Sequence, residues 1–81
     1  MIRNNIKEYR RKFKITQDEL AQELGVSKQY ISKLEVVEYV PGLDIFFKII
    51  KAFRNITEKK SGGMMVKELT LDDLVYDDDY I

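Results

Sequence analysis

Residues 16–35 read TQDELAQELGVSKQYISKLE and contain two helix starts separated by one short turn. Thr16, followed three residues later by Glu19, forms a capping box, the pattern with which many helices begin. Gly25 favours the positive φ of a helix C-terminus, and Ser27 is a good cap for a second helix. The sequence therefore predicts two helices with only three residues between them.

The short connection decides how these two helices pack. Helices joined by so tight a turn cannot lie antiparallel side by side, so they cross steeply, as in a helix-turn-helix. Ala21 is small enough for a close crossing. The second helix is anchored inward by apolar residues, namely Val26, Ile31 and Leu34. This arrangement turns polar residues outward, namely Lys28, Gln29, Ser32 and Lys33.

Apolar periodicity predicts a helix on the N-terminal side of this pair. Four apolar residues recur at spacings of 4, 3 and 4, namely Ile2, Ile6, Tyr9 and Phe13. Asn4 or Asn5 is a candidate cap, and a start nearer Met1 is the alternative.

Further helices are predicted on the C-terminal side. After Pro41-Gly42, a helix begins near Leu43. Its expected apolar face consists of Leu43, Phe46, Phe47, Ile50 and Phe53, widened by Ile45 and Ile49. A helix this apolar is mostly enclosed, and in so small a domain full enclosure can require a second copy of the chain. Thr70 caps a last short helix that contains Leu71 and Leu74.

We therefore expect one all-α domain of five helices. Residues 1–53 form its core, residues 54–69 are a connecting insertion, and residues 70–81 are a short helix with an acidic tail. Two interpretations of the insertion remain open. The fourth helix continues to Lys60 and ends at the following glycines, or the flanks of those glycines pair as a short β-hairpin. The run from Asp77 to Asp79 is expected to be a frayed terminus.

Composition excludes several classes of site. The 81 residues include no cysteine and no histidine, which rules out Cys-His and Ser-His-Asp catalysis and zinc sites built on those residues. No apolar run approaches the ~20 residues of a membrane span, and no signal peptide opens the chain. We expect a cytoplasmic protein with no cofactor, no metal and no membrane contact.

Charge is unevenly distributed along a chain whose net charge is zero. Residues 1–60 carry a net charge of +5, and residues 61–81 carry −5. This division suggests a body that faces a polyanion, together with an acidic tail. A solvated tail without a function explains the negative charge of residues 61–81 equally well.

Residues 16–35 resemble the helix-turn-helix of the Cro/repressor (XRE-type) DNA-binding proteins. The resemblance extends from about Ile2 to Phe53 and returns weakly at residues 70–74. It implies a five-helix, all-α domain that binds operator DNA, usually as a homodimer. Residues 28–35 would form the recognition helix, whose N-terminal residues reach base edges in the major groove.

The resemblance assigns roles to individual residues. Base contacts fall to Lys28, Gln29, Tyr30 and Lys33, because glutamine pairs with adenine, lysine with guanine, and a tyrosine ring with a thymine methyl group or a phosphate. Phosphate contacts fall to Arg11, Lys14, Thr16, Gln17, Ser27 and Ser32, with Gln17 at the positive end of its helix. Arg10 and Glu35 are expected to form a structural ion pair between the first and third helices.

One segment and one further residue depart from the family pattern. Residues 36–40 read VVEYV where the family often has a loop that meets phosphate, so we expect no phosphate contact there. These apolar residues are expected to pack on the fourth helix or on a partner chain. Lys14 occupies a position that is frequently glycine, at a small cost in strain.

Three functions are compared. The first is a sequence-specific repressor, Cro-like and homodimeric, that binds double-stranded DNA. The second is the antitoxin of a toxin–antitoxin pair, in which residues 54–81 bind a protein partner and DNA binding is secondary. The third, an enzyme, is not expected, because the aspartates at residues 72, 73 and 77–79 lack a preorganised cage for a metal ion.

Overall fold

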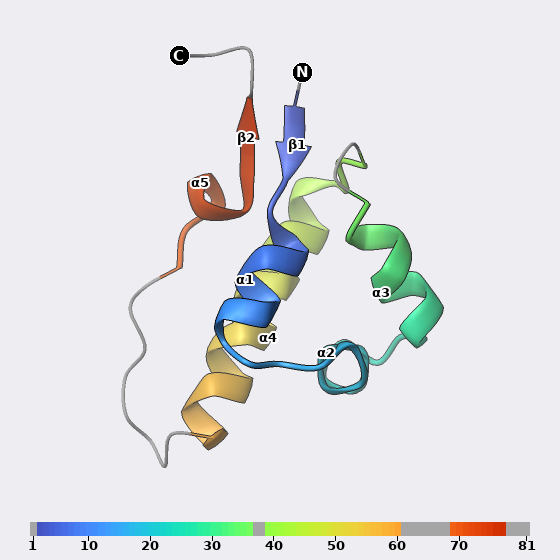
Figure 1. Cartoon of the computed structure of the whole chain (residues 1–81), viewed down its shortest axis with the longest axis vertical. Helices are drawn as coiled ribbons and strands as arrows, with labels where there is room; N and C mark the ends of the chain where they lie inside the picture. Colours follow the sequence, from blue (N-terminus) through green and yellow to red (C-terminus); the bar gives the residue numbers. More distant parts are fainter. Residues whose placement is uncertain (1, 37–38, 61–68, 78–81) are drawn as a thin grey trace.

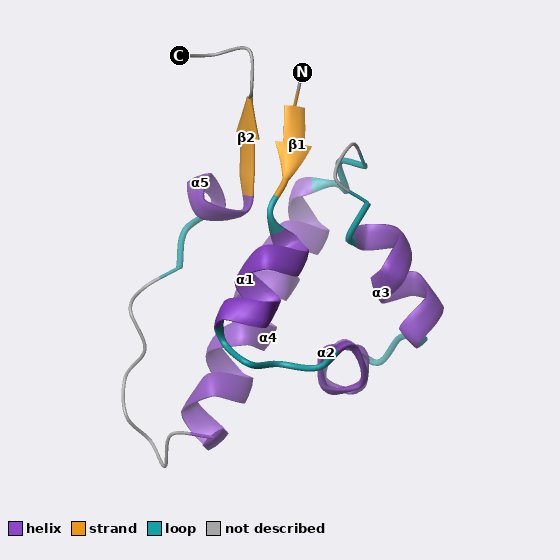
Figure 2. Ribbon diagram, viewed as in Figure 1, coloured by secondary structure: helices purple, strands orange, loops and turns teal. Residues whose placement is uncertain are grey.

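The computed structural model of the 81-residue chain describes residues 2–36, 39–60 and 69–77. This part of the chain is mostly helical (Figures 1 and 2). Its elements are, in order, β1 (Ile2–Asn4), α1 (Ile6–Lys12), α2 (Gln17–Leu24), α3 (Lys28–Leu34), α4 (Leu43–Lys60), α5 (Leu71–Leu74) and β2 (Val75–Asp77). The five helices confirm the expected fold class, and the two strands are an addition to it.

The helix-turn-helix consists of α2 and α3. The Thr16 hydroxyl accepts a hydrogen bond from the Glu19 backbone N–H, and the Glu19 carboxylate accepts one from the Thr16 N–H, which completes the capping box. Gly25 ends α2 at a φ of 71°, and the Ser27 hydroxyl caps α3 by accepting from the Tyr30 N–H. Figure 1 looks down the axis of α2 and sees α3 from the side, so the two helices cross steeply.

The core lies between α4 and the other helices. Its fully buried members come from every helix, and the largest are Phe46, Phe53, Ile6, Ile15, Leu20, Ile31, Leu34, Ile49 and Leu74. α4 runs behind α1 and contributes the longest buried face (Figure 1).

The predicted apolar face of α4 was partly wrong. Phe46, Ile50 and Phe53 are buried, but Leu43 is 61% exposed and Phe47 is 57% exposed. The buried face instead follows Phe46, Ile49, Ile50, Phe53 and Ile56 at helical spacing. The first two turns of α4 are apolar on both sides, so periodicity alone could not decide which side faces inward.

The N-terminal residues form a strand, not the predicted first turn of a helix. β1 pairs antiparallel with β2, and Ile2 lies opposite Asp77, Arg3 opposite Tyr76, and Asn4 opposite Val75. Ile2 fits a helical spacing by coincidence, because a pairing between the two ends of a chain leaves no local periodic signal. Asp77 therefore belongs to a strand and not to a frayed terminus.

Asn4 joins this small sheet to the end of α3. Its side chain is 4% exposed, and its Nδ2 donates toward the carbonyl oxygens of Leu34 at 3.1 Å, Val36 at 2.9 Å and Tyr39. Its Oδ1 accepts from the Ile6 N–H at 3.2 Å. One buried amide thus connects β1, α1 and the segment that follows α3.

The C-terminal elements pack onto this body. Asp73 accepts hydrogen bonds from the Thr70 N–H and hydroxyl, which begins α5, and Leu74 is fully buried. The Leu74 carbonyl accepts from the Asn5 N–H at 2.7 Å. α4 continues to Lys60, as the first interpretation of residues 54–69 proposed, and residues 54–60 are not part of a hairpin. The predictions made for residues 61–68 and 78–81 lie outside the described residues.

Substituting Asn4 tests this connection. We expect Asn4→Ala to lower the free energy of unfolding by about 1–3 kcal/mol, because one buried and two partly buried carbonyl groups lose their donor. Chemical denaturation followed by circular dichroism measures the loss. Asn5→Ala is the matched control, because that half-buried side chain makes one longer bond, of 3.3 Å, to the Asp73 carbonyl. Equal losses in the two variants would contradict the assignment.

Candidate nucleic-acid interface

α3 turns one polar side to solvent and one apolar side to the body. Ile31 and Leu34 are fully buried. The side chains that the sequence placed outward are all exposed, namely Lys28, Gln29, Ser32 and Lys33. The short helix is therefore anchored through its apolar side, and its polar side is accessible to a partner.

Tyr30 lies differently from the other candidate base contacts. Its ring is half-buried and packs against the hydrophobic core. It lines a hollow of about 230 Å³ together with Leu24, Val26, Ile45 and Lys48. The structure thus places most of this ring against the body, while Lys28, Gln29 and Lys33 extend outward.

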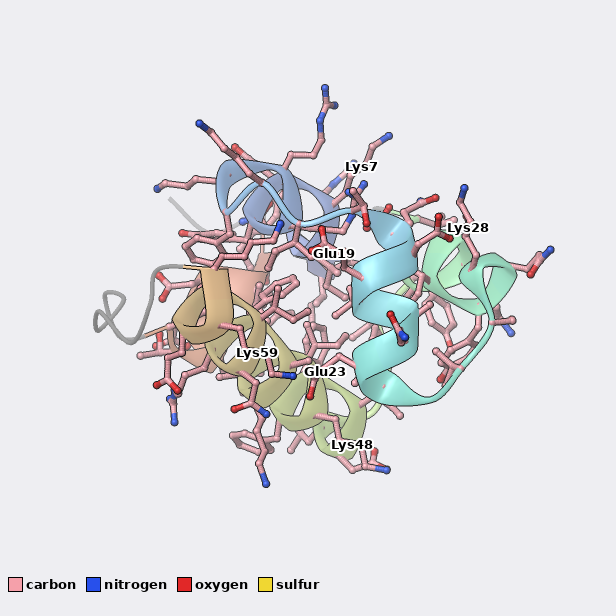
Figure 3. The ribbon with its side chains drawn as sticks, turned by 90° about the horizontal axis from the view of Figure 1, so that it is seen from below. Lys7, Glu19, Glu23, Lys28, Lys48 and Lys59 are labelled. Carbon is pink, nitrogen blue, oxygen red and sulfur yellow. The ribbon has the colours of Figure 1, made fainter. Side chains whose placement is uncertain are left out.

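The two lysines of α3 are only weakly held. Lys28 Nζ lies 4.0 Å from an Asp18 carboxylate oxygen, and both side chains are mostly exposed. Lys28 extends from the ribbon beside the start of α2 (Figure 3). Lys33 Nζ lies 5.4 Å from the centre of the Tyr39 ring. Exposed contacts of this kind contribute little stability, so both ammonium groups can turn toward another ligand at small cost.

A broad hollow of about 620 Å³ lies at the start of α2, next to α3. Four of the predicted phosphate contacts line it, namely Arg11, Lys14, Thr16 and Gln17. Lys28 also borders this hollow, so the hollow connects the four residues with the exposed side of α3. We call it the basic hollow. The start of α2 adds the partial positive charge of its free N–H groups.

The two predicted serine contacts lie on α3 and at its start. Both side chains are exposed. The Ser27 hydroxyl is the cap of α3, and Ser32 is one turn along the exposed side. No described contact joins them to the basic hollow.

A buried polar network lies beneath the hollow. Arg10 and Glu35, which the sequence paired, form an ion pair through Arg10 Nε, and both residues are below 10% exposed. Arg10 also donates to the Ile15 carbonyl at 2.8 Å. Gln17 Nε2 donates to Glu35 Oε1 at 2.9 Å, so its side chain contacts the network. The network ties α1, the start of α2 and the end of α3 together.

Lys14 is strained, as its departure from glycine predicts. Its φ is 59°, the only positive value among the described non-glycine residues. Its carbonyl accepts from Lys60 Nζ at 2.6 Å, which helps to hold the turn. The strained backbone directs the exposed Lys14 side chain to the edge of the basic hollow.

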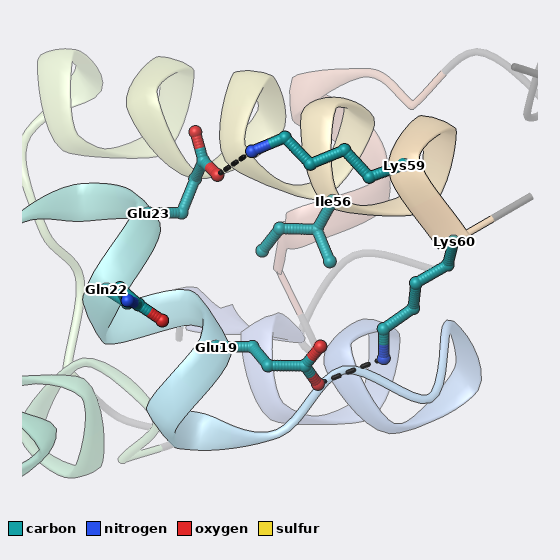
Figure 4. A pocket seen from close by; sticks show the side chains of 6 residues that line it. All are labelled: Glu19, Gln22, Glu23, Ile56, Lys59 and Lys60. Carbon is teal, nitrogen blue, oxygen red and sulfur yellow. Dashed lines mark hydrogen bonds and ion pairs between the residues drawn. The ribbon is translucent and has the colours of Figure 1, made fainter. Parts of the chain in front are cut away.

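A second hollow, between α2 and α4, pairs its charges internally (Figure 4). Glu19 contacts Lys60 at 2.9 Å, Glu23 contacts Lys59 at 3.4 Å, and Ile56 lies between them. Hydrogen bonding from the Thr16 backbone and then from Lys60 lowers the pKa of Glu19. Because the charges in this hollow pair with each other, they hold α2 and α4 together and leave a poor binding site.

Among the described residues, no three acidic side chains group closely enough to hold a metal ion. No helix in the described part of the chain is both long and apolar enough to cross a membrane.

Comparison with known proteins places the chain in a family. The helix-turn-helix domain family matches residues 6–59, which run from α1 to the end of α4. The chain belongs to this helix-turn-helix family. Its α2 and α3 are therefore the two helices of a DNA-binding regulator's motif, which the resemblance to XRE-type proteins implied.

Relatives occur in archaea and bacteria. An uncharacterized HTH-type transcriptional regulator of Methanocaldococcus jannaschii is 35% identical over 78 residues, 96% of this chain and 98% of that protein. One from Archaeoglobus fulgidus is 44% identical over 52 residues, 64% of this chain and 73% of the relative. The uncharacterized HTH-type transcriptional regulator YgzD of Bacillus subtilis is 38% identical over 52 residues, 64% of this chain and 79% of that protein. No solved structure matches the chain significantly.

Breaking the buried ion pair tests its structural role. We expect Arg10→Met to lower the free energy of unfolding by about 3–5 kcal/mol, because the buried Glu35 carboxyl group loses its cationic partner and keeps the Gln17 amide. The double variant Arg10→Met/Glu35→Leu should recover most of this loss, because no unpaired charge remains. Urea denaturation of both variants measures the difference, and equal losses would show that the charge pairing is unimportant.

The lowered pKa of Glu19 predicts a pH dependence. Its carboxylate stabilises the fold fully above the unfolded value of 4.5, and this contribution disappears as the pH falls through the lower folded value. Glu19→Gln should therefore cost at most about 1 kcal/mol at pH 7 and nothing once Glu19 is protonated. Melting curves at pH 7 and pH 3 test this. Lys60→Met should remove only part of the effect, because Thr16 is the larger cause.

Proposed function

We propose that the protein is a sequence-specific transcriptional repressor, Cro-like, that binds operator DNA as a homodimer. The observation that carries the proposal is the exposed polar side of α3 beside the basic hollow. An α-helix of this size fits the major groove of B-DNA. Because Ile31 and Leu34 hold α3 rigidly, its outward side chains are presented in a fixed arrangement.

Base reading is assigned to the exposed residues of α3. Gln29 can donate to and accept from an adenine edge, and Lys28 or Lys33 can donate to guanine. Tyr30 contributes only through the part of its ring that is exposed, either to a thymine methyl group or to a phosphate. Because that ring is half-buried against the core, we assign it mainly a structural role, in which it fixes the distance between α3 and the core.

Phosphate binding is assigned to the hollow at the start of α2. Arg11 and Lys14 supply full charges, and the first turn of α2 supplies backbone N–H groups near Thr16 and Gln17. Ser27 and Ser32 flank this surface on α3. The Gln17 side chain donates to Glu35, so we assign its phosphate contact to its backbone N–H.

The charge distribution favours this orientation. The acidic segment of α5 and β2 lies on the other side of α1 from α3 (Figure 1). DNA held against α3 therefore meets the basic body and stays away from these aspartates, which limits repulsion.

The direct experiment is selection of bound sequences from random double-stranded DNA. A repressor of this kind should yield a motif with two half-sites about one helical turn apart, ~34 Å. Affinity for the selected site should fall steeply as salt rises, because counterions are released from the phosphates. Failure to select any motif, or a flat salt response, would contradict the proposal.

Substitutions should separate base reading from phosphate binding. Gln29→Ala should cost about 1–3 kcal/mol on the selected site and relax the preference at one position. Lys14→Asn should weaken all sequences alike and reduce the salt slope by about one, because asparagine tolerates a positive φ but carries no charge. Binding titrations at several salt concentrations measure both effects. Lys59→Ala, on the opposite side of α2 from Lys28 (Figure 3), should change neither.

A further inference from the structure

Exposed apolar side chains gather at one end of the described structure. Six large apolar residues have more than a third of their surface exposed, namely Ile2, Val36, Val40, Leu43, Phe47 and Tyr76. They belong to β1, β2, the segment between α3 and α4, and the first two turns of α4. These elements lie together at the upper end in Figure 1. Such a concentration marks a surface that another molecule covers.

The opposite end has a different chemistry. There α2 and the last turns of α4 meet through the ion pairs of Glu19 with Lys60 and Glu23 with Lys59 (Figure 4). None of the six exposed apolar residues belongs to this end. The exposed apolar side chains are therefore concentrated at one end of the described structure, and a small core alone does not explain them.

The first two turns of α4 show why a partner is required. Leu43 and Phe47 are one turn apart, so they lie on the same side of the helix. Phe46 and Ile50 cover the inner side and are buried in the core. A helix that is apolar on two sides is normally covered on both, and the described residues cover only one.

We propose that Leu43 and Phe47 form the centre of the contact between two copies of this chain. The inference rests on the proposed function and names the interface of the proposed homodimer. A contact across a two-fold axis uses the same surface on both copies, so it must be complementary to itself. The residues that flank Leu43 and Phe47 meet this requirement.

Asp44 and Lys48 supply the complementary charges. Both are exposed and lie on α4 one turn apart, along the same edge of the apolar strip. If two α4 helices cross antiparallel at this strip, Asp44 of one copy lies opposite Lys48 of the other, and the pairing repeats across the axis. The strip is therefore complementary to a second copy of itself, as a two-fold contact requires.

Light scattering during size-exclusion chromatography tests the contact on the full chain. The unmodified chain should be a dimer at micromolar concentration. Phe47→Glu should raise the dimer dissociation constant roughly a hundredfold or more, because two exposed rings lose their cover and two charges are buried. Gln22→Glu, the matched control, adds the same charge on an exposed position of α2 and should leave the dimer unchanged. Circular dichroism verifies that both variants are folded.

Charge reversal gives a second, independent measurement. Asp44→Lys and Lys48→Asp should each weaken the dimer, because each places like charges opposite one another. The double variant Asp44→Lys/Lys48→Asp should restore the dimer, since both pairs are present again in reverse order. Mixing the two single variants separates this contact from a pairing within one helix. The mixed dimer places two lysines of one copy opposite two aspartates of the other and should form, although neither copy has an opposite-charge pair of its own.

Two results would overturn the inference: a monomer at every concentration, or a dimer that Phe47→Glu leaves intact. DNA selection distinguishes these results from a failure of the proposed function. If the chain selects a half-site although Phe47→Glu has no effect on its oligomeric state, the function stands and this interface is wrong. If Phe47→Glu dissociates the dimer but no DNA motif is selected, the interface stands and the proposed function fails.

Discussion

The buried contact of Arg10 with Glu35 holds together the surface that we propose faces DNA. Three separate segments meet at it, because Arg10 also donates to the Ile15 carbonyl and Glu35 also accepts from Gln17. Burying two charges is expensive unless each has several partners, and here each has them. The position of α3 relative to the start of α2 is consequently fixed by hydrogen-bond geometry as well as by apolar packing.

Asn4 provides a second connection, at the other end of α3. The network around Arg10 fixes α3 against the first two helices, whereas Asn4 ties its last carbonyl groups to the small sheet. Since β2 completes that sheet, the C-terminal residues support the orientation of a helix that lies far from them in sequence. A seven-residue helix has little stability of its own, so contacts at both ends are needed to keep it rigid.

Local signals made the helix-turn-helix predictable, whereas non-local contacts could not be predicted from such signals. The caps at Thr16 and Ser27 and the turn at Gly25 depend on neighbours in sequence, and the structure has each of them as expected. The sheet joins the two ends of the chain, and Asn4 in the sequence indicated only a helix cap. The pairing of Arg10 with Glu35 came from resemblance, because no periodic pattern relates residues that lie 25 positions apart.

The exposed apolar side of α4 is related to the small size of the chain. A chain of 81 residues buries a smaller fraction of its surface than a large domain does, and α2 and α5 pack against α4 on its inner side. Leu43 and Phe47 would be costly on a helix that stays exposed, and a polar residue at either position would keep the fold intact. Their presence is explained if the surface that α4 lacks within one copy is supplied by another.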